Sequence, residues 1–231
     1  MRFAAFACLA FAACLVPAVA EEAVDPDVTV LYGGGDLTGW VGREDLWSAE
    51  DGEIVGRTSD EDPIDANTFL IWEGSKPADF ELTLQFKIEG GNSGIQYRSK
   101  VLDDKKFIVG GYQADIDFGN RYAGILYEEK GRGILAERGE SVKIGSDGEK
   151  SKTRFGDAKA LGAGIHPGQW NDFRVLAKGN KLQHFINGTM TIEVIDEQPE
   201  QSASDGVIAL QIHRGPAMTV RFKNIKLRSL K

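Results

Sequence analysis

The segment 79–91, DFELTLQFKIEGG, alternates apolar and polar side chains along its length. Its apolar set is Phe80, Leu82, Leu84, Phe86 and Ile88, and its polar set is Glu81, Thr83, Gln85 and Lys87. A period of two puts successive side chains on opposite faces of a β-strand, whereas an amphipathic helix repeats about every 3.6 residues. The pattern therefore predicts a half-buried strand whose apolar face must pack against a second layer.

Residues 171–195 predict three consecutive strands joined by tight turns. The strand segments are NDFRVLAK (171–178), KLQHFI (181–186) and TMTIEVI (189–195), separated by Gly179-Asn180 and Asn187-Gly188. Asn-Gly accepts positive φ at both central positions of a type I′ turn, which joins neighbouring antiparallel strands. An antiparallel meander is therefore expected here.

Further strand patterns recur at short spacing, and helical periodicity is scarce. They lie at 94–99, 111–118, 123–129, 205–213 and 217–230. Ten or more strands joined mostly by tight turns predict an all-β fold, an antiparallel two-sheet β-sandwich of the jelly-roll type. We expect one domain over residues 21–231, because no linker or second hydrophobic centre divides the chain.

Residues 128–169 are charged and glycine-rich, with weak periodicity. This segment is expected to form a long loop, and such loops in a compact domain are usually functional or disordered. The stretch DAKALGAG (157–164) has the composition of a short helix.

Residues 1–20 have the pattern of a secretory signal peptide. Arg2 precedes an apolar run that ends in Ala18-Val19-Ala20, so cleavage is expected after Ala20. The run is too short for a comfortable membrane span, and no later stretch is long and apolar enough to cross one. Cys8 and Cys14 are the two cysteines and lie inside this segment, so the mature protein, periplasmic or secreted, is expected to hold no disulfide. The formal net charge of −8 argues against nucleic acid or an anionic membrane as partner.

Three strand patterns carry directional polar side chains opposite an apolar row. By alternation, the residues that share a face are Gln96 with Arg98, then Gln113 with Asp115 and Asp117, then Gln211 with His213. A merely solvated face would more often carry Lys, Glu, Thr and Ser. Amide, guanidinium, carboxylate and imidazole groups hydrogen-bond hydroxyls with defined geometry. We expect these rows to line a groove for a hydroxyl-rich ligand.

Other polar residues have two interpretations. His184 shares a face with Leu182 and Ile186, so it is either a ligand contact or a hydrogen-bonded core histidine. The acidic run 60–62 either binds calcium or is solvated. The sequence holds no transition-metal spacing and no phosphate-binding glycine loop. No cofactor is expected to be required, and assistance by a divalent metal stays open.

Several stretches occur in a familiar order: LYGGGDLTGW, DFELTLQFKI, GNSGIQYRS, GYQADI, YAGILYEE, GQWNDFRVLAKGNKLQHFINGT, GVIALQIHRG and VRFKNIKL. This series resembles the 3-keto-disaccharide hydrolase family of exported bacterial proteins, from Leu31 to Leu230. The resemblance implies a concanavalin A-like jelly roll and a sugar substrate that has been oxidised at C3. Many members carry Glu where this chain has Gln113, which leaves the role of that family residue open here.

A C3 ketone makes the hydrogen at C2 acidic and places the glycosidic C1–O bond β to the carbonyl. Cleavage then needs a base, a stabiliser for the enolate oxygen and an acid for the leaving group. Candidate roles are His213 as base, Arg98 as enolate stabiliser and Asp115 as the alternative base or the residue that orients His213. Gln96, Gln113 and Gln211 would bind hydroxyls, together with Asp117 and His184, and Tyr127 and Glu128 are the weaker acid candidates.

Two other functions compete with this one. A non-catalytic carbohydrate-binding module could use the same fold, because fold does not fix function. A conventional retaining glycosidase needs two carboxylates about 5 Å apart. The usual Glu-x-Asp-x-x-Glu strand signature is absent from the sequence, so this is the weakest of the three.

Overall fold

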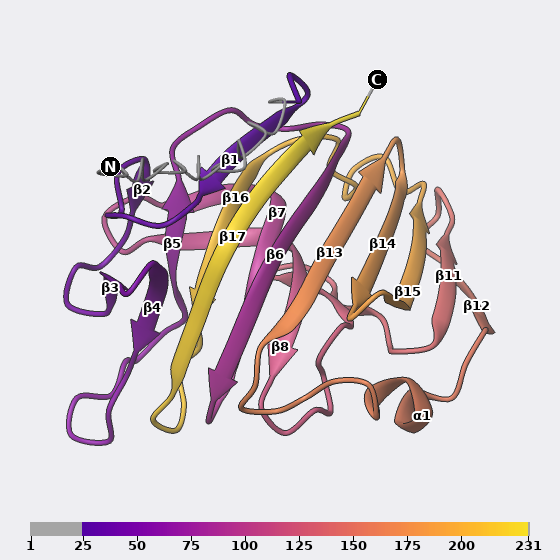
Figure 1. Ribbon diagram of the computed structural model, residues 1–231. Helices are drawn as coiled ribbons and strands as arrows, with labels where there is room; N and C mark the ends of the chain where they lie inside the picture. The colour runs from indigo at the N-terminus through magenta and orange to yellow at the C-terminus, as the bar shows by residue number, and fades with distance from the viewer. Residues whose placement is uncertain (1–24, 231) are drawn as a thin grey trace, which may run out of the picture.

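The computed structural model describes residues 25–230, which form seventeen strands and one short helix in two sheets (Figure 1). In spatial order, the ten-stranded sheet contains β12 (Lys150–Arg154), β11 (Glu140–Ile144), β15 (Thr189–Asp196), β14 (Lys181–Ile186), β13 (Asn171–Lys178), β6 (Phe80–Glu89), β17 (Thr219–Ser229), β4 (Glu53–Arg57) and β3 (Trp47–Glu50), with β1 (Val28–Tyr32) paired to β17. The seven-stranded sheet contains β10 (Gly133–Ala136), β9 (Leu126–Glu129), β8 (Ile108–Asp117), β7 (Asn92–Asp103), β16 (Val207–Ile212), β5 (Thr68–Trp72) and β2 (Trp40–Val41).

The two sheets lie face to face, with β6, β13 and β17 in front of β5, β7 and β16 in Figure 1. Strand neighbours are antiparallel except for β11 and β15, which pair in parallel. The predicted antiparallel two-sheet jelly-roll sandwich is therefore confirmed.

The core lies between the sheets, where alternate residues of each strand meet. β6 buries every second residue, from Phe80 to Ile88, as its alternation predicts. The facing sheet contributes Ile95, Ala114 and Leu126 to the same core. Burial of apolar surface stabilises such a core by about 25 cal/mol per Å². The side chains between these residues along β7, β8 and β9 must therefore point to the outward face of the seven-stranded sheet.

The Asn187-Gly188 turn has the predicted backbone conformation. Asn187 has φ 49° and Gly188 has φ 78°, both in the left-handed region that a type I′ turn requires. The turn joins β14 to β15, so the expected antiparallel meander of β13, β14 and β15 is confirmed.

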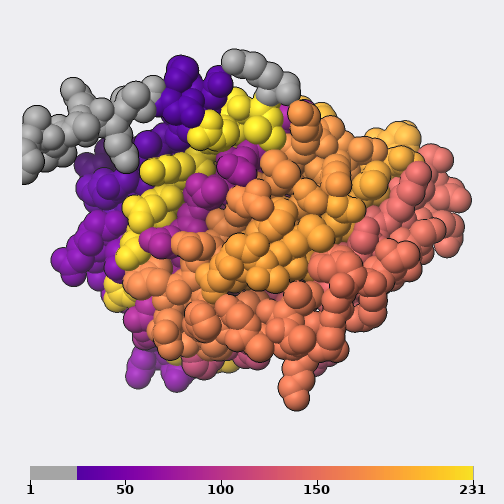
Figure 2. Space-filling model, turned by 45° about the vertical axis from the view of Figure 1, so that its right-hand side comes forward, coloured from indigo at the N-terminus to yellow at the C-terminus, as the bar shows by residue number. Residues whose placement is uncertain are grey.

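The expectation of a long loop over residues 128–169 is wrong. The segment contains the end of β9, then β10, β11 and β12, and the helix α1 (Ala158–Gly162), which occupies the expected helical stretch. β11 buries Glu140, Val142 and Ile144 on one side, a period of two that the surrounding charges obscure in the sequence. In Figure 2 this part of the chain continues the surface formed by β13–β15, at the right-hand side of the molecule.

A small hydrophobic cluster fills part of the outward face of the seven-stranded sheet. It is made of Phe69, Ile71, Val109, Val207 and Ala209, with Phe107 packed against it. The cluster covers the middle of β5 and β16 from outside. It therefore confines any open cavity on this face to the remaining area.

The expected signal peptide, with its cleavage site and both cysteines, lies outside the described residues. Within residues 25–230, no helix has the length and the apolar character needed to cross a membrane.

Candidate functional site

A cavity of about 860 Å³ opens on the outward face of the seven-stranded sheet. Its walls come from β8, β9 and β10 and from the segments that precede β5 and β7 and follow β16. The charged and titratable side chains that line it are Asp65, Asp115, Asp117, Tyr122, Tyr127, Glu129, Lys130, His213 and Arg214. This cavity is the candidate site.

Strand register builds the floor of the cavity. Gln96 of β7 lies opposite Gln113 of β8, Gln113 lies opposite Tyr127 of β9, and Tyr127 lies opposite Ile134 of β10. Directly opposed residues share a face, so these four side chains form one row across the sheet. The row is polar at its centre and apolar at the β10 edge.

Buried amides form a directed hydrogen-bond relay that ends on Asp115. Ser99 Oγ donates to Gln96 Oε1 (2.6 Å), Gln96 Nε2 donates to Gln113 Oε1 (2.7 Å), and Gln113 Nε2 donates to Asp115 Oδ1 (2.6 Å). Gln211 Nε2 adds a second donor to Gln113 Oε1 at 3.0 Å. Each amide is fixed by its neighbour, because its oxygen is used as an acceptor and its nitrogen as a donor. The relay therefore aims an N–H group at the Asp115 carboxyl.

Gly94 makes room for this relay. A Cβ at this position would lie 2.5 Å from Cδ of Gln113, closer than side chains tolerate. Gly94 lies opposite Asp115 in the register of β7 and β8. A side chain here would push the Gln113 amide away from Asp115.

The Asp115 carboxyl is held largely in its protonated form. Burial, which disfavours the charged state, raises its pKa to about 8, and the nearby Asp117 and Glu129 carboxylates add to the effect. The Gln113 hydrogen bond acts in the opposite direction. Asp115 is only 7% exposed, yet it lines the cavity. A buried carboxyl that keeps its proton near neutral pH is suited to general acid catalysis.

Glu129 is a site residue that the sequence analysis missed. Its carboxylate lines the cavity and accepts a hydrogen bond from Asn67 Nδ2 (3.3 Å). Asn67 Oδ1 in turn accepts from the backbone N–H of Arg214 (3.0 Å), which fixes the segment that carries His213. Alternation along LYEE places Glu129 on the same face as Tyr127, so a consistent period of two could have found it.

Asp117 lines the cavity but also holds the turn after β8. Its Oδ2 accepts from the backbone N–H groups of Arg121 (2.8 Å) and Tyr122 (3.0 Å), and its Oδ1 from that of Gly119 (3.2 Å). This carboxylate therefore shapes the cavity wall, in addition to any contact it makes with a ligand.

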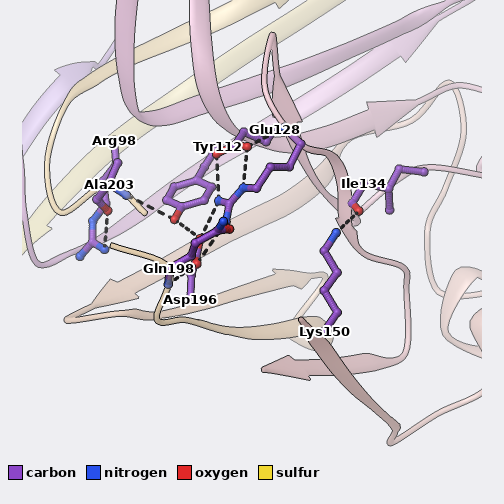
Figure 3. Close-up of polar contacts among 9 residues, drawn as sticks. Arg98, Tyr112, Glu128, Ile134, Lys150, Asp196, Gln198 and Ala203 are labelled. Carbon is purple, nitrogen blue, oxygen red and sulfur yellow. Dashed lines mark hydrogen bonds and ion pairs between the residues drawn. The ribbon is translucent and has the colours of Figure 1, made fainter. Parts of the chain in front are cut away.

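The expectation that Arg98 shares a face with Gln96 is wrong, and Arg98 does not line the cavity. Its φ is +46°, and the β7–β8 register shifts between Tyr97 and Lys100, so the alternation breaks at this residue. The guanidinium is 1% exposed and donates to the carbonyls of Ala78 (2.6 Å) and Gly179 (2.7 Å). Figure 3 shows Arg98 beside Ala203, on the side of Tyr112 away from Glu128. Arg98 therefore links β7 of one sheet to the segments beside β6 and β13 of the other, at one end of the sandwich.

Glu128 also lies outside the cavity, on the opposite side of β9 from Tyr127 and Glu129. Its carboxylate binds Arg132 through Nε (2.8 Å) and Nη2 (2.9 Å). The same guanidinium binds Asp196 (2.6 Å), which accepts from the Tyr112 hydroxyl (2.5 Å). Figure 3 shows these side chains gathered around one guanidinium group. Glu128 is thus part of a buried ion-pair cluster.

His184 is a core histidine. It is fully buried, with Nδ1 3.2 Å from the Ile125 carbonyl and Nε2 2.9 Å from the Tyr97 hydroxyl. A carbonyl can only accept, so Nδ1 carries the proton and Nε2 accepts from Tyr97. Burial lowers the pKa of the imidazole to about 3, which keeps it neutral. Its expected contact with a ligand is therefore wrong.

The structure brings five of the sequence-predicted residues to one cavity: Gln113, Asp115, Asp117, Tyr127 and His213. Gln96 and Gln211 lie beneath them in the amide network and are fully buried, so their expected contact with ligand hydroxyls is wrong. Apart from Arg98, the polar residues expected from the three strand patterns therefore gather at or directly beneath one cavity. Within residues 25–230, no group of three or more His, Cys, Asp or Glu side chains is arranged to hold a metal ion.

Comparison with known families gives one match over nearly the whole described chain. The family described as the 3-keto-alpha-glucoside-1,2-lyase-like domain matches residues 27–228. No curated protein matches the sequence.

Solved structures with the same fold include proteins from two bacteria. A provisionally assigned glycosyl hydrolase from Parabacteroides distasonis is 21% identical, with a TM-score of 0.57 over 88% of this chain and 99% of its own. A second such protein from the same organism is 20% identical, with a TM-score of 0.57 over 88% of this chain and 94% of its own. The carbohydrate binding module CBM66 from Bacillus subtilis is 17% identical, with a TM-score of 0.56 over 83% of this chain and 96% of its own. At these identities the likeness establishes the fold.

Proposed function

Because the chain belongs to the family of 3-keto-alpha-glucoside-1,2-lyase-like domains, we propose that it cleaves the glycosidic bond of sugars oxidised at C3. The reaction is a β-elimination across C1 and C2, followed by addition of water. The observation that carries the proposal is that the buried Asp115 carboxyl, whose pKa is raised by burial to about 8, and the His213 imidazole line the same cavity. Elimination needs one proton acceptor and one proton donor, and these two groups supply them.

In the first step the His213 imidazole takes the proton from C2. The electron pair of the C2–H bond forms a C2–C3 double bond, and the carbonyl electron pair moves to the C3 oxygen, which gives an enolate with its negative charge on that oxygen. In the second step the enolate reforms the ketone, a C1–C2 double bond forms, and the C1–O bond breaks. The leaving oxygen takes the proton of Asp115. Water then adds at C1: it gives one proton to the Asp115 carboxylate, its OH bonds to C1, and the His213 imidazolium returns its proton to C2.

The enolate oxygen needs a cation or hydrogen-bond donors near it. Arg98 was expected in this role, but its guanidinium is bound to backbone carbonyls at the end of the sandwich. Lys130 and Arg214 are the cations that line the cavity. We assign the role to this pair, and Gln113 and Asn67 to hydroxyl binding. A divalent metal remains an alternative stabiliser, which chelation with EDTA will test.

The test is release of nitrophenol from p-nitrophenyl glucosides, in both anomers, with and without oxidation at C3. We expect release from a 3-keto glucoside alone, with a large loss in His213→Ala and a smaller loss in Asp115→Asn, because nitrophenolate leaves without a proton. His166→Ala is the matched control, because His166 is an exposed histidine outside the cavity. Equal release from unoxidised glucosides would favour an ordinary glycosidase mechanism.

A carbohydrate-binding module is the alternative function, because the fold is also that of CBM66. It predicts binding of sugars without release of nitrophenol. It also predicts that Asp115→Asn leaves the affinity nearly unchanged, since no proton transfer is needed. Calorimetry that shows binding of the 3-keto glucoside by the wild-type protein, with no release of nitrophenol, would favour the binding module.

A further inference from the structure

The two ends of the cavity differ in chemical character. The sheet order β10-β9-β8-β7-β16-β5 places the segments around His213 and Asn67 at one end and Ile134 at the other, with Asp115 of β8 between them. Groups able to hydrogen-bond hydroxyls lie at the His213 end. Asn67 at this end donates a hydrogen bond to Glu129 and accepts one from the backbone N–H of Arg214. A sugar ring, which carries a hydroxyl on most carbons, is matched to that end.

The other end is apolar. Ile125, Tyr127 and Ile134 line it from β9, β10 and the turn before β9, and Tyr122 closes it from the same turn. Tyr127 and Ile134 are directly opposed in register, so their side chains lie side by side on the outward face. This wall offers contact to an apolar group and few partners for hydroxyls.

Two members of this wall are large apolar side chains that remain exposed. Ile134 is 38% exposed and Tyr122 is 36% exposed, and the Arg121 guanidinium lies 5.0 Å from the centre of the Tyr122 ring. Single exposed apolar residues are ordinary, but these two line the same cavity, where an apolar group of a ligand can contact them. The cavity volume of about 860 Å³ is within the range of about 300–1,000 Å³ typical of drug-sized ligands. It has room for a sugar ring and a second group.

We infer that the β9–β10 end of the cavity is the leaving-group subsite, and that it selects glycosides whose aglycone is aromatic or otherwise apolar. The inference rests on the proposed function, because it places the scissile oxygen beside Asp115. With the sugar at the His213 end, the bond to the aglycone crosses β8 and the aglycone lies over Tyr127 and Ile134. Ile134 and Tyr122 are then specificity-determining residues.

The test compares benzyl and methyl 3-keto-α-glucosides. Their leaving alcohols are of similar acidity, so a difference in kcat/KM reports contact with the aglycone and not the chemistry of bond cleavage. We expect the wild-type protein to favour the benzyl glycoside by roughly tenfold or more, the scale of one small apolar contact surface. Ile134→Ser and Tyr122→Ser should each reduce this preference severalfold, whereas Ile134→Val should retain most of it.

Val30→Ser and Phe155→Ser are the matched controls, since both residues are exposed apolar side chains outside the cavity. They should keep the wild-type preference. Thermal unfolding followed by circular dichroism verifies that every variant is folded.

Equal kcat/KM for the two glycosides would overturn the inference and leave the proposed function standing. A benzyl preference that survives both Ile134→Ser and Tyr122→Ser would overturn the assignment of the subsite to this wall. If neither glycoside is bound or cleaved, the proposed function itself fails and the inference fails with it.

Discussion

Asp115 is surrounded by groups that oppose its ionisation. Burial acts first, and the Asp117 and Glu129 carboxylates add a like-charge effect. The Gln113 amide is a counteracting donor to the ionised form. A carboxyl in this environment destabilises the fold at neutral and alkaline pH. Such local destabilisation is common at catalytic sites.

We predict that Asp115→Asn stabilises the protein at pH 8 and not at pH 4. The folded pKa of about 8 lies above the unfolded value of about 3.9. The contribution of the carboxyl to stability is therefore full below pH 4 and is lost as the pH rises toward 8. Since each pKa unit corresponds to about 1.4 kcal/mol, the gain at pH 8 should be of the order of a few kcal/mol.

Urea unfolding at pH 4, 6 and 8 measures this difference. Asp62→Asn, at an exposed aspartate outside the cavity, should show no comparable gain at pH 8. A stability difference between Asp115→Asn and wild type that does not change from pH 4 to pH 8 would contradict the buried, protonated carboxyl.

The amide relay makes a second prediction at the residue scale. Gln113→Met removes the donor to the ionised Asp115 carboxylate while it keeps a side chain of similar length. Because that hydrogen bond lowers the pKa of Asp115, its loss should raise the pKa further. A ¹³C NMR titration of the labelled Asp115 carboxyl detects the change. A pKa that falls or stays constant would show that the relay does not act on Asp115.

At the scale of elements, β7 shows why alternation alone misplaces Arg98. The period of two holds from Gly94 to Tyr97 and fails at Arg98, where positive φ turns the chain. Such a conformation is uncommon outside glycine and asparagine, and nothing local in the sequence predicts it here. The bulge returns Ser99 to the relay and sends Arg98 to the end of the sandwich. Glu128 was misplaced for a different reason: Glu128 and Glu129 point to opposite faces of β9, and Glu128 is the one that points away from the cavity.

The ion-pair cluster around Arg132 links the β9–β10 turn to the end of β15. Arg132 binds both Glu128 and Asp196, which are 6% and 2% exposed. Arg132→Ala leaves both carboxylates buried without their cation, so we predict a loss of about 3 kcal/mol in the free energy of unfolding.

Arg43→Ala is the matched control for this prediction. Arg43 pairs with Asp45 on the surface, where both side chains are more than a third exposed. Its loss should cost less than about 1 kcal/mol. Equal losses measured by urea unfolding for the two variants would show that burial of the Arg132 cluster adds nothing to stability.

At the scale of the whole molecule, the β-sandwich could be predicted from local sequence patterns. Alternation in β6 and the Asn187-Gly188 turn predict strands and their antiparallel connection. The residues that line the cavity were partly predictable, because side chains on one face of adjacent strands lie close together however the rest of the chain folds. The amide relay, the neutral state of His184 and the strands within 128–169 depend on packing between distant segments. Periodicity does not carry that information.

The central claim is that bond cleavage begins with removal of the C2 hydrogen. The most direct measurement is the rate of nitrophenol release from a p-nitrophenyl 3-keto-glucoside carrying deuterium at C2, compared with the same compound carrying hydrogen. Elimination predicts a markedly slower release from the deuterated substrate, and loss of turnover in His213→Ala. Equal rates for the two substrates, with turnover intact, would contradict elimination and point to direct displacement at C1.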